Sequence, residues 1–300
     1  MATIINDLRE LFRRGDIHIR LIFVNTVIFL TITLVQIVLM LFRINVGEWL
    51  RWVELPASVS QFLSQPWSIV TYMFMHTGVM HLLFNMLWLY WFGQLFLYFF
   101  TSRHLRGVYL WGGICGGLLY MLFFNLFPYF EYVVDYTYMV GASASVLAVV
   151  AAVAYREPNY RVNLMFLGSL PLKYFALVVI GLDLLFVTTD NAGGHIAHIG
   201  GALGGLLFAY LLNRGTDLTR FINQAVDWFA TLFTFQLKRR KPKMKVNYGG
   251  ASQDSPQPQD KQQDTSRQQR IEEIRQKIKQ SGYQGLTEEE KKELFNASIR

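Results

Sequence analysis

The stretch AHIGGALGGLLFAYLLN, residues 197–213, says more about the fold than any other segment of this chain. With the two residues before it, it approaches the ~20 residues that a helix needs to cross a bilayer. His198 is followed by Gly201 and Gly205 at i+3 and i+7, so all three residues share one helix face. Small residues on such a face let a second helix approach closely. The segment therefore predicts a membrane helix whose histidine lies against a neighbouring helix.

The composition of the whole chain is that of a membrane protein. Of its 300 residues, 52% are hydrophobic and only 16% are charged, which is too apolar for an ordinary soluble domain. The apolar residues form segments whose lengths come close to a membrane span. We predict an all-α polytopic membrane protein with a six-helix bundle, its spans at about residues 21–42, 79–100, 107–127, 138–155, 172–188 and 195–213.

The net charge of +7 does not indicate a nucleic-acid partner. The basic residues form short clusters that flank the apolar segments, and flanking charge of this kind is typical of membrane spans. Arginines precede the first segment, lie between the second and third and between the fourth and fifth, and follow the sixth. The positive-inside rule places these flanks in the cytoplasm. We expect a multi-pass protein of a bacterial inner membrane, in contact with the lipid bilayer, with both termini cytoplasmic.

Cysteine usage limits the covalent and metal chemistry that the sequence predicts. The single cysteine, Cys115, lies in an apolar segment. It allows no intramolecular disulfide and no cysteine-based metal site. No cofactor and no metal are expected, and the sequence leaves the oligomeric state open.

Four polar residues stand out within the apolar segments. His81, Asn85, Ser143 and His198 each lie within one or two turns of the predicted outer end of a span. Polar side chains inside a membrane are costly, which makes them candidates for function. At ~1.5 Å per residue the four share one depth in the bilayer. Gly141, close to Ser143, and the glycines after His198 favour a contact between the fourth and sixth spans, close enough for a serine to be activated by a histidine.

These residues resemble the motifs of the rhomboid family of intramembrane serine proteases. The resemblance covers about residues 20–213 and implies Ser143 as the nucleophile and His198 as its base. It also implies that the Ser143 amide, His81 and Asn85 line the oxyanion site. The implied substrates are single-span membrane proteins, cleaved within or beside their transmembrane segment. The motifs that match are HTGVMHLLFN (76–85), GAS (141–143) and AHIGGALGG (197–205).

Some positions depart from the family pattern. Trp67 resembles the tryptophan of a Trp-Arg pair in the first outer loop, but Ser68 stands where arginine is usual. Ala144 replaces a frequent glycine after the nucleophile. Leu147 occupies a place where many relatives carry an aromatic ring that packs against the histidine. The anchoring of the loop and the orientation of His198 are therefore expected to differ from the common pattern.

No acidic partner for His198 is evident from the sequence. Asp183 and Asp190 are the nearest acids along the chain. The fifth span does not face the site in the family arrangement, so Asp183 is expected to find a helix-packing partner instead. His195 is expected at the outer surface, and His76 is expected to pack within the loop.

The resemblance and the composition divide the chain into four segments. From Arg239 the sequence becomes basic and then polar and of low complexity, which is typical of a linker. Thr287 and Glu290 have the spacing of a helix capping box near the C-terminus. The predicted segments are a cytosolic N-terminal segment (1–20), a six-helix protease domain (21–213), a basic and disordered linker (214–270) and a short helical cytosolic tail (271–300).

Two other functions compete with proteolysis as explanations of these residues. A rhomboid-like protein that binds membrane proteins without cutting them commonly lacks the serine or the histidine, whereas this chain has both Ser143 and His198. A channel or transporter would need polar residues along a path across the bilayer. Here they gather near one face, and Lys173 and Asp183 are the only charges within the spans that could extend such a path.

Overall fold

The computed structural model divides the chain into two compact units, Met1–Gln236 and Leu237–Arg300. All the candidate site residues lie in the first unit, which is built mainly of helices, as the sequence predicted. The structure describes residues 12, 15–44, 47–164, 168–189, 191–233, 270, 272–274, 276–278 and 285–291.

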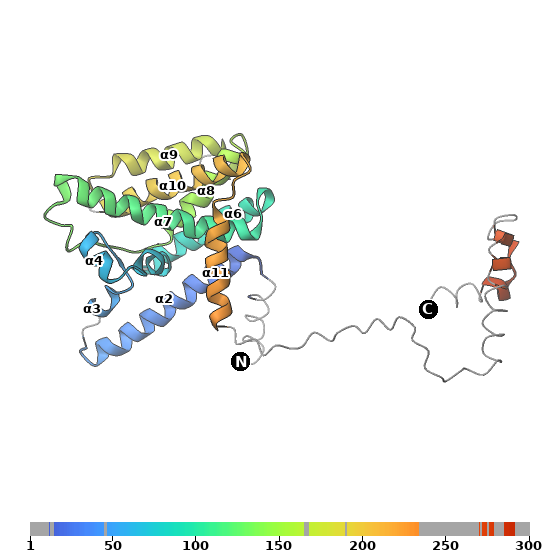
Figure 1. The fold of residues 1–300 in the computed structure, drawn as a ribbon, viewed down its shortest axis with the longest axis horizontal. Coiled ribbons are helices and arrows are strands. Elements are labelled where there is room, and N and C mark those ends of the chain that lie inside the picture. The colour runs from blue at the N-terminus through green and yellow to red at the C-terminus, as the bar shows by residue number, and fades with distance from the viewer. Residues whose placement is uncertain are drawn as a thin grey trace, which may run out of the picture. The chain divides into compact units, whose positions relative to one another are not determined.

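Long apolar helices make up most of the first unit (Figure 1). Among the described residues, four helices are long and apolar enough to cross a membrane: α2 (Ile17–Leu41), α6 (Val79–Phe99), α7 (Ser102–Leu126) and α10 (Ala192–Asn213). The helices α8 (Ser143–Arg156) and α9 (Leu172–Leu185) have only 14 residues each. At 1.5 Å per residue they reach ~21 Å, which is less than the ~30 Å of a bilayer core. The predicted apolar helices are therefore present, but two of them are shorter than a full span.

Helix α8 is the most deeply buried helix of the bundle. Its residues from Ala144 to Ala154 are all buried, and it packs against α6, α7, α9 and α10. Helices α7 and α10 pack closely through glycines. A methyl group added at Gly116 would lie 2.8 Å from the Ala197 carbonyl oxygen, and one added at Gly200 would lie 2.7 Å from that of Cys115. Lipid tails provide little hydrophobic force between helices, so such close van der Waals packing holds the bundle together.

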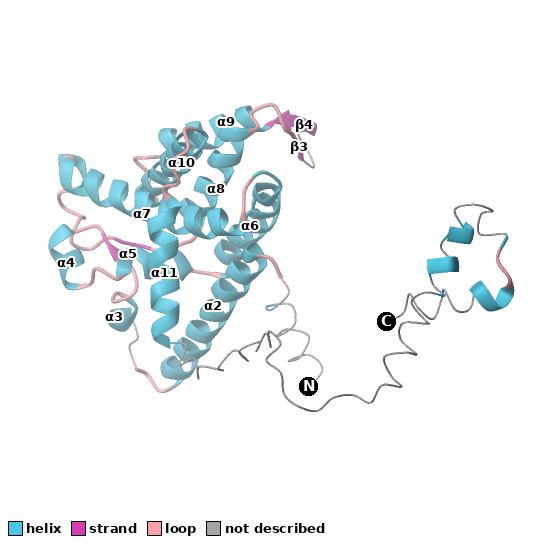
Figure 2. Ribbon diagram, turned by 45° about the vertical axis from the view of Figure 1, so that its right-hand side comes forward, coloured by secondary structure: helices cyan, strands magenta, loops and turns pink. Residues whose placement is uncertain are grey.

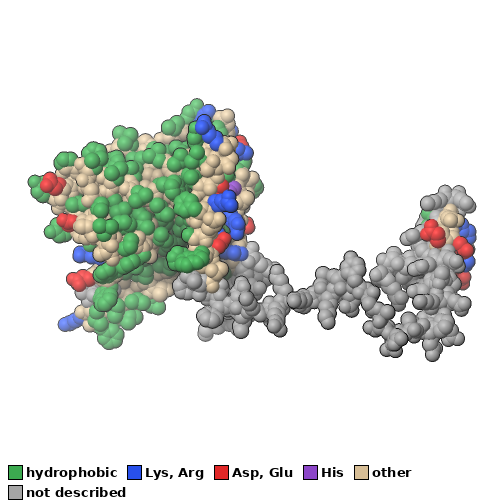
Figure 3. Space-filling view, in the orientation of Figure 1, with side chains coloured by type: hydrophobic (Ala, Val, Ile, Leu, Met, Phe, Trp, Pro, Cys, Tyr) green, Lys and Arg blue, Asp and Glu red, His purple; other side chains and the backbone are tan. Residues whose placement is uncertain are grey.

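The outside of this bundle is apolar. Large hydrophobic side chains remain well exposed on α2, α6 and α9, among them Leu34, Met80 and Leu184. Figure 3 shows hydrophobic side chains across the visible face of the bundle, with Lys and Arg side chains mainly at its right-hand edge and a few at the lower left. A continuous apolar surface of this kind is suited to lipid rather than to water.

The fourth predicted span begins later than the sequence indicates. A helix is predicted from residue 138, whereas Tyr138–Met139 form the strand β2, and α8 starts at Ser143. β2 pairs antiparallel with β1 (Leu55–Pro56) in the loop after α2. Between β2 and α8, Gly141 has φ +132°, a conformation that other residues rarely adopt. The strand and this turn place Ser143 at the first residue of a helix rather than within one.

A β-hairpin precedes α9. The all-α prediction places a span from residue 172 and includes no strand before it. The structure instead pairs β3 (Arg161–Leu164) with β4 (Gly168–Pro171) in an antiparallel hairpin (Figure 2). Pro171 ends β4, and α9 begins at the next residue, as predicted.

The long loop between α2 and α6 is built of short elements. Hydrogen bonds from buried tyrosines attach this loop to the bundle. The Tyr72 hydroxyl donates to the Gly113 carbonyl at 2.6 Å, and the Tyr109 hydroxyl donates to the Met73 carbonyl at 3.0 Å. The loop is therefore fixed against α7 directly before the residues that begin α6. Its elements are α3 (Gly47–Leu50), β1, α4 (Val59–Ser64), α5 (Ser68–Thr71) and η1 (Tyr72–Phe74), and the short turn η2 (Pro128–Phe130) follows α7.

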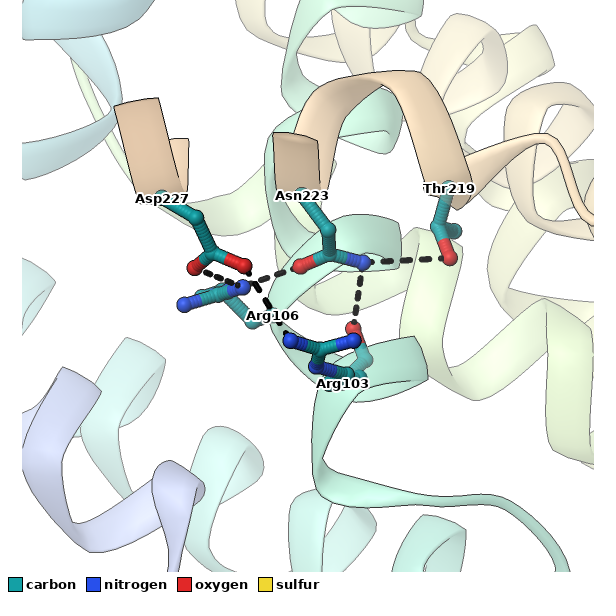
Figure 4. Close-up of polar contacts among 5 residues, drawn as sticks. All are labelled: Arg103, Arg106, Thr219, Asn223 and Asp227. Atoms are coloured by element: carbon teal, nitrogen blue, oxygen red, sulfur yellow. Dashed lines mark hydrogen bonds and ion pairs between the residues drawn. The ribbon is translucent and has the colours of Figure 1, made fainter. Parts of the chain in front are cut away.

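A helix that the sequence did not predict follows α10. Residues 214–270 are predicted as linker, but Thr219–Phe233 form the amphipathic helix α11, which packs against the first turns of α7. Figure 4 shows the polar contacts between the two helices. Arg106 donates to Asn223 Oδ1 at 2.7 Å and pairs with Asp227 at 2.8 Å, while Asn223 donates to the Arg103 carbonyl at 3.0 Å. The compact unit consequently extends past the boundary predicted at residue 213.

The second unit contains the capping box that the sequence predicted. The Thr287 backbone N–H donates to Glu290 Oε2 at 2.8 Å, and the Glu290 N–H donates to Thr287 Oγ1 at 3.4 Å. Residues 288–291 are helical, as are the described residues between 270 and 278. Ile274 and Leu286 are buried within this unit.

Candidate active site

Two glycines on α10 set the distance between α10 and α8. Methyl groups added at Gly201 and Gly205 would collide with the carbonyl oxygens of Ala144 and Ala148. Only hydrogen fits at these two positions, so the helices meet backbone to backbone. His198 lies one turn before Gly201 on the same face of α10. The packing therefore directs His198 toward the start of α8.

This contact brings His198 to Ser143. The Nε2 atom of His198 lies 2.7 Å from the Ser143 hydroxyl oxygen, which is hydrogen-bond distance. The second serine of α8, Ser145, is buried, and its hydroxyl has no hydrogen-bond partner among the described residues. It faces α7, since a methyl group added at Gly113 would lie 2.7 Å from its oxygen. Of the two serines, Ser143 is the one in contact with the imidazole.

Asp183 holds the other ring nitrogen of His198. Its Oδ1 atom lies 2.9 Å from His198 Nδ1 and 2.8 Å from His195 Nδ1. The Asp183 side chain is 8% exposed, and each imidazole is 21% exposed. The prediction that the fifth span does not face the site is therefore wrong, and so is the prediction of a plain surface role for His195.

The hairpin of α9 and α10 explains how these residues meet. Asp183 lies two residues before the end of α9, while His195 and His198 lie in the first two turns of α10. A short connection folds one helix back on the other, so residues equally far from the turn become neighbours. The signal in the sequence was a single acid in an otherwise apolar helix, because such a charge needs a partner inside a membrane.

The residues predicted to stabilise an oxyanion gather on another side of Ser143. A methyl group added at Gly141 would lie 2.9 Å from His81 Nε2 and 3.7 Å from Ser143 Oγ, so these groups surround the turn at Gly141. The His81 Nδ1 atom lies 3.1 Å from the Thr77 hydroxyl. Asn85 is buried and donates to the His81 carbonyl at 2.9 Å. The structure thus places His81 beside Ser143. Asn85 is held near them by its hydrogen bond to the His81 carbonyl.

The start of α8 contributes a further donor. Ser143 is the first residue of the helix, and the first N–H groups of a helix have no acceptor within it. They lie at the positive end of the helix dipole, where negative charge is favoured. The Ser143 amide therefore lies at a position suited to a developing anion.

A cavity of about 410 Å³ lies next to these residues, between α2, the long loop and the start of α6. His76 lines it, and its ring meets the His81 ring edge-on at 5.1 Å between centroids. Burial, and repulsion by a charged His81, lower the pKa of His76 to about 4, so this ring is neutral near pH 7. Glu54 also lines the cavity, and burial raises the pKa of its carboxyl. Burial thus opposes the charged form of both groups beside the site.

The positions that depart from the family pattern have identifiable surroundings. Trp67 stacks on Trp52 and donates from Nε1 to the Trp52 carbonyl at 2.7 Å. Ser68 is fully buried, with no hydrogen-bond partner for its hydroxyl among the described residues. Leu147, on α8, is buried in a hydrophobic cluster of the bundle. Residue 147 offers no aromatic ring to His198, whose ring contacts instead include the hydrogen bond to Asp183 and the His195 ring, edge-on at 6.1 Å between centroids.

Comparison with known proteins identifies the family of the chain. The rhomboid domain matches residues 63–215, a region that contains α6 to α10. RHOMBOID-like protein 7 of Arabidopsis thaliana is 29% identical over 155 aligned residues, and the match covers 49% of this chain and 43% of that protein. The chain thus spans less than half the length of that relative. With its apolar helices and this domain match, the chain is an integral membrane protein of the rhomboid family.

Proposed function

We propose that the chain is an intramembrane serine endopeptidase. Its substrates are single-span membrane proteins, which it cleaves within or next to the transmembrane segment. The observation that carries this proposal is the distance of 2.7 Å between Ser143 Oγ and His198 Nε2. A hydroxyl becomes a good nucleophile when a base at hydrogen-bond distance can take its proton.

In the proposed reaction, His198 acts as general base and then as general acid. Its Nε2 atom takes the proton of Ser143 as the oxygen attacks the scissile carbonyl, and returns it to the leaving amine. Asp183 accepts a hydrogen bond from Nδ1–H of His198. This bond favours the tautomer whose Nε2 carries a free lone pair, and it stabilises the imidazolium that forms. Asp183 is thus a positioning residue that acts through His198.

The negative charge on the carbonyl oxygen needs donors in place before the reaction. The Ser143 amide, His81 and Asn85 are the proposed donors, and they lie near the first turns of α8 and α6. Fixed donors in a site with little water typically contribute ~10²-fold to 10³-fold each to turnover. The cavity beside His81 provides room for the water that hydrolyses the acyl-enzyme.

The proposed topology has six membrane helices with both termini in the cytoplasm of a bacterial cell. In this arrangement α2, α6, α7, α8, α9 and α10 are the spans, and the protease domain covers about residues 21–213. The arginines at the start of α7, at the end of α8 and at the start of β3 then face inward. The residues after 213, α11 included, lie on the cytoplasmic side, where the segment 271–300 is a small helical tail without catalytic residues.

The competing proposal is a rhomboid-family protein that binds membrane proteins without cutting them. Such a protein has no need for a serine and a histidine at bonding distance with an aspartate behind the histidine. The contacts of Ser143, His198 and Asp183 therefore favour the protease.

A fluorophosphonate probe and a generic single-span substrate test the proposal on the purified full chain in detergent. The wild-type protein is expected to react with the probe at Ser143 and to produce a new substrate terminus that mass spectrometry can locate. Ser143→Ala and His198→Gln should abolish both signals. Ser145→Ala is the matched control, because Ser145 lies on the same helix but faces α7, and it should retain both.

Two results would contradict the proposal. One is cleavage by Ser143→Ala at the wild-type rate. The other is labelling of Ser145 in place of Ser143 by the probe. A folded wild-type protein that binds a single-span substrate, yet neither cleaves it nor reacts with the probe, would favour the binding protein instead.

A further inference from the structure

Asp183, His195 and His198 form a compact group of possible metal ligands. One ligand atom from each of the three residues can be chosen so that all lie within 4.8 Å of one another. The same carboxylate oxygen, Asp183 Oδ1, is 2.8 Å from one imidazole Nδ1 and 2.9 Å from the other. Two histidines at i and i+3 on α10 therefore converge with one acid from α9. Neither helix alone carries this set, and the sequence predicted no metal ligand here.

One atom of this group lacks a partner. Asp183 Oδ2 is buried, and it has no hydrogen-bond partner among the described residues. A buried carboxylate oxygen without a donor costs free energy, which a cation or a water can recover. The hydrogen bonds to Oδ1 account for one oxygen of the carboxylate and leave the other free to bind.

The chemistry of the group selects among cations. Two imidazole nitrogens and one carboxylate oxygen are a typical ligand set for Zn²⁺, with bonds of ~2.0–2.2 Å and a fourth position left for water. Ligand atoms around a tetrahedral ion are then separated by little more than 3 Å, so small side-chain shifts are enough to open the present contacts. Mg²⁺ and Ca²⁺ prefer sites made entirely of oxygen. Side-chain exposures of 21% leave both imidazoles within reach of water.

We propose that Asp183, His195 and His198 bind Zn²⁺, and that this metal inhibits the chain. The inhibition rests on the proposed function, whereas the binding does not. Zn²⁺ on Nδ1 of His198 uses the lone pair of that nitrogen, so the ring proton must reside on Nε2. The Nε2 atom then donates to Ser143 Oγ and cannot take the proton of the serine. The metal also occupies Asp183, which otherwise orients the imidazole.

Direct binding tests the site independently of any proteolysis. Purified full-length protein in detergent is titrated with Zn²⁺ by calorimetry, and with Co²⁺ as an optical stand-in for zinc. Wild type is expected to bind one Zn²⁺ per chain. His195→Gln, which removes one ligand, should weaken this binding by at least ~10-fold.

The matched control for this variant is His104→Gln. His104 is also 21% exposed and also lies near an aspartate, Asp217, at 3.5 Å, but it has no second imidazole beside it in the described part of the chain. This variant should bind Zn²⁺ as wild type does. The site is excluded if wild type binds no Zn²⁺ in a saturable manner, or if His195→Gln binds it as tightly as wild type.

Activity then tests the inhibition. Zn²⁺ should stop substrate cleavage and slow labelling by the fluorophosphonate, and a chelator should restore both, whereas Mg²⁺ at the same concentration should have no effect. Measured relative to its own turnover without metal, His195→Gln should need at least ~10-fold more Zn²⁺ than wild type for half inhibition. Equal sensitivity of wild type and His195→Gln would overturn the inhibitory role. A chain that binds Zn²⁺ through His195 but never cleaves a substrate would retain the metal site and refute the protease.

Discussion

In the part of the chain that the structure describes, a histidine–aspartate contact lies near each end of α10. At the start of the helix, His198 Nδ1 lies 2.9 Å from an Asp183 side chain that is 8% exposed. Beyond the other end of α10, a helix ~33 Å long at 1.5 Å per residue, His104 Nε2 lies 3.5 Å from an Asp217 side chain that is 33% exposed. The same two residue types therefore meet in a nearly dry environment and in a partly hydrated one.

The two aspartates bind different groups. Asp183 Oδ1 accepts from two imidazoles, whereas Asp217 Oδ1 accepts from the backbone and the hydroxyl of Thr219 at the start of α11. Asp217 thus caps a helix, and its contact with His104 is weakened by water. Asp183 fixes an imidazole that itself contacts a serine. The comparison teaches that the same two residue types differ in burial and in their third partner, and the catalytic role that we propose rests on both differences.

The largest difference between the pairs is expected from matched substitutions of the two acids. Asp183→Asn presents an amide that can donate to His198 Nδ1, which favours the tautomer unable to accept from Ser143. Turnover should fall by ~10²-fold to 10⁴-fold with little change in KM. Asp217→Asn keeps an oxygen acceptor for Thr219, so turnover should stay within about twofold and stability within ~1 kcal/mol. Steady-state kinetics with one substrate measures both variants.

A conservative variant distinguishes positioning by Asp183 from mere support of the fold. Asp183→Glu restores a carboxylate, so part of the activity and of the fluorophosphonate labelling rate should return. If Asp183→Asn and Asp217→Asn lose activity equally, or if Asp183→Asn labels as fast as wild type, the special role of the buried pair is refuted.

A smaller loss is expected at Asn85, which lies near the buried pair but outside it. Asn85→Ala removes one proposed oxyanion donor while Ser143, His198 and Asp183 stay in place. Turnover should fall by ~10²-fold to 10³-fold, with residual activity clearly above that of Ser143→Ala. Complete loss of activity in a folded Asn85→Ala protein would mean that Asn85 supports the site in some other way.

The next prediction concerns the packing of α10 against α8, in the part of α10 between the two histidine–aspartate pairs. A methyl group at Gly205 would meet the Ala148 carbonyl oxygen, whereas one at Gly181 on α9 meets no atom within 4 Å. Gly205→Ala should therefore destabilise the bundle by ~1–3 kcal/mol, and Gly181→Ala should not. Thermal unfolding in detergent measures both. Equal unfolding temperatures of Gly205→Ala and Gly181→Ala would show that α8 and α10 can move apart without loss of stability.

The smallest effect is expected from removal of residues 246–300. All the proposed catalytic residues precede Asn213, and the polar contacts of α11 with α7 stay intact in such a variant. Cleavage of a model substrate should remain within about threefold of the wild-type rate. A truncated protein that unfolds like wild type but cuts nothing would make the tail part of the catalytic machinery.

The sequence by itself determined the membrane class of the chain, because spans of ~20 apolar residues and arginine flanks are local patterns. It also predicted that Ser143 and His198 would meet, since Gly201 and Gly205 on the face of His198 require a close neighbour. The predicted spans from residues 79 and 172 also begin where α6 and α9 begin, because the apolar pattern that marks each start is local.

Only the tertiary structure placed Asp183 and His195 at the site. Asp183 is one acid in an apolar helix, and which partner it finds depends on how α9 folds back on α10. The start of α8 at Ser143 depends on the pairing of β2 with β1, which lies more than 80 residues earlier in the chain. Helix α11 likewise depends on arginines of α7 that bind Asn223 and Asp227. These features arise from contacts between distant segments, which local hydrophobicity and spacing do not encode.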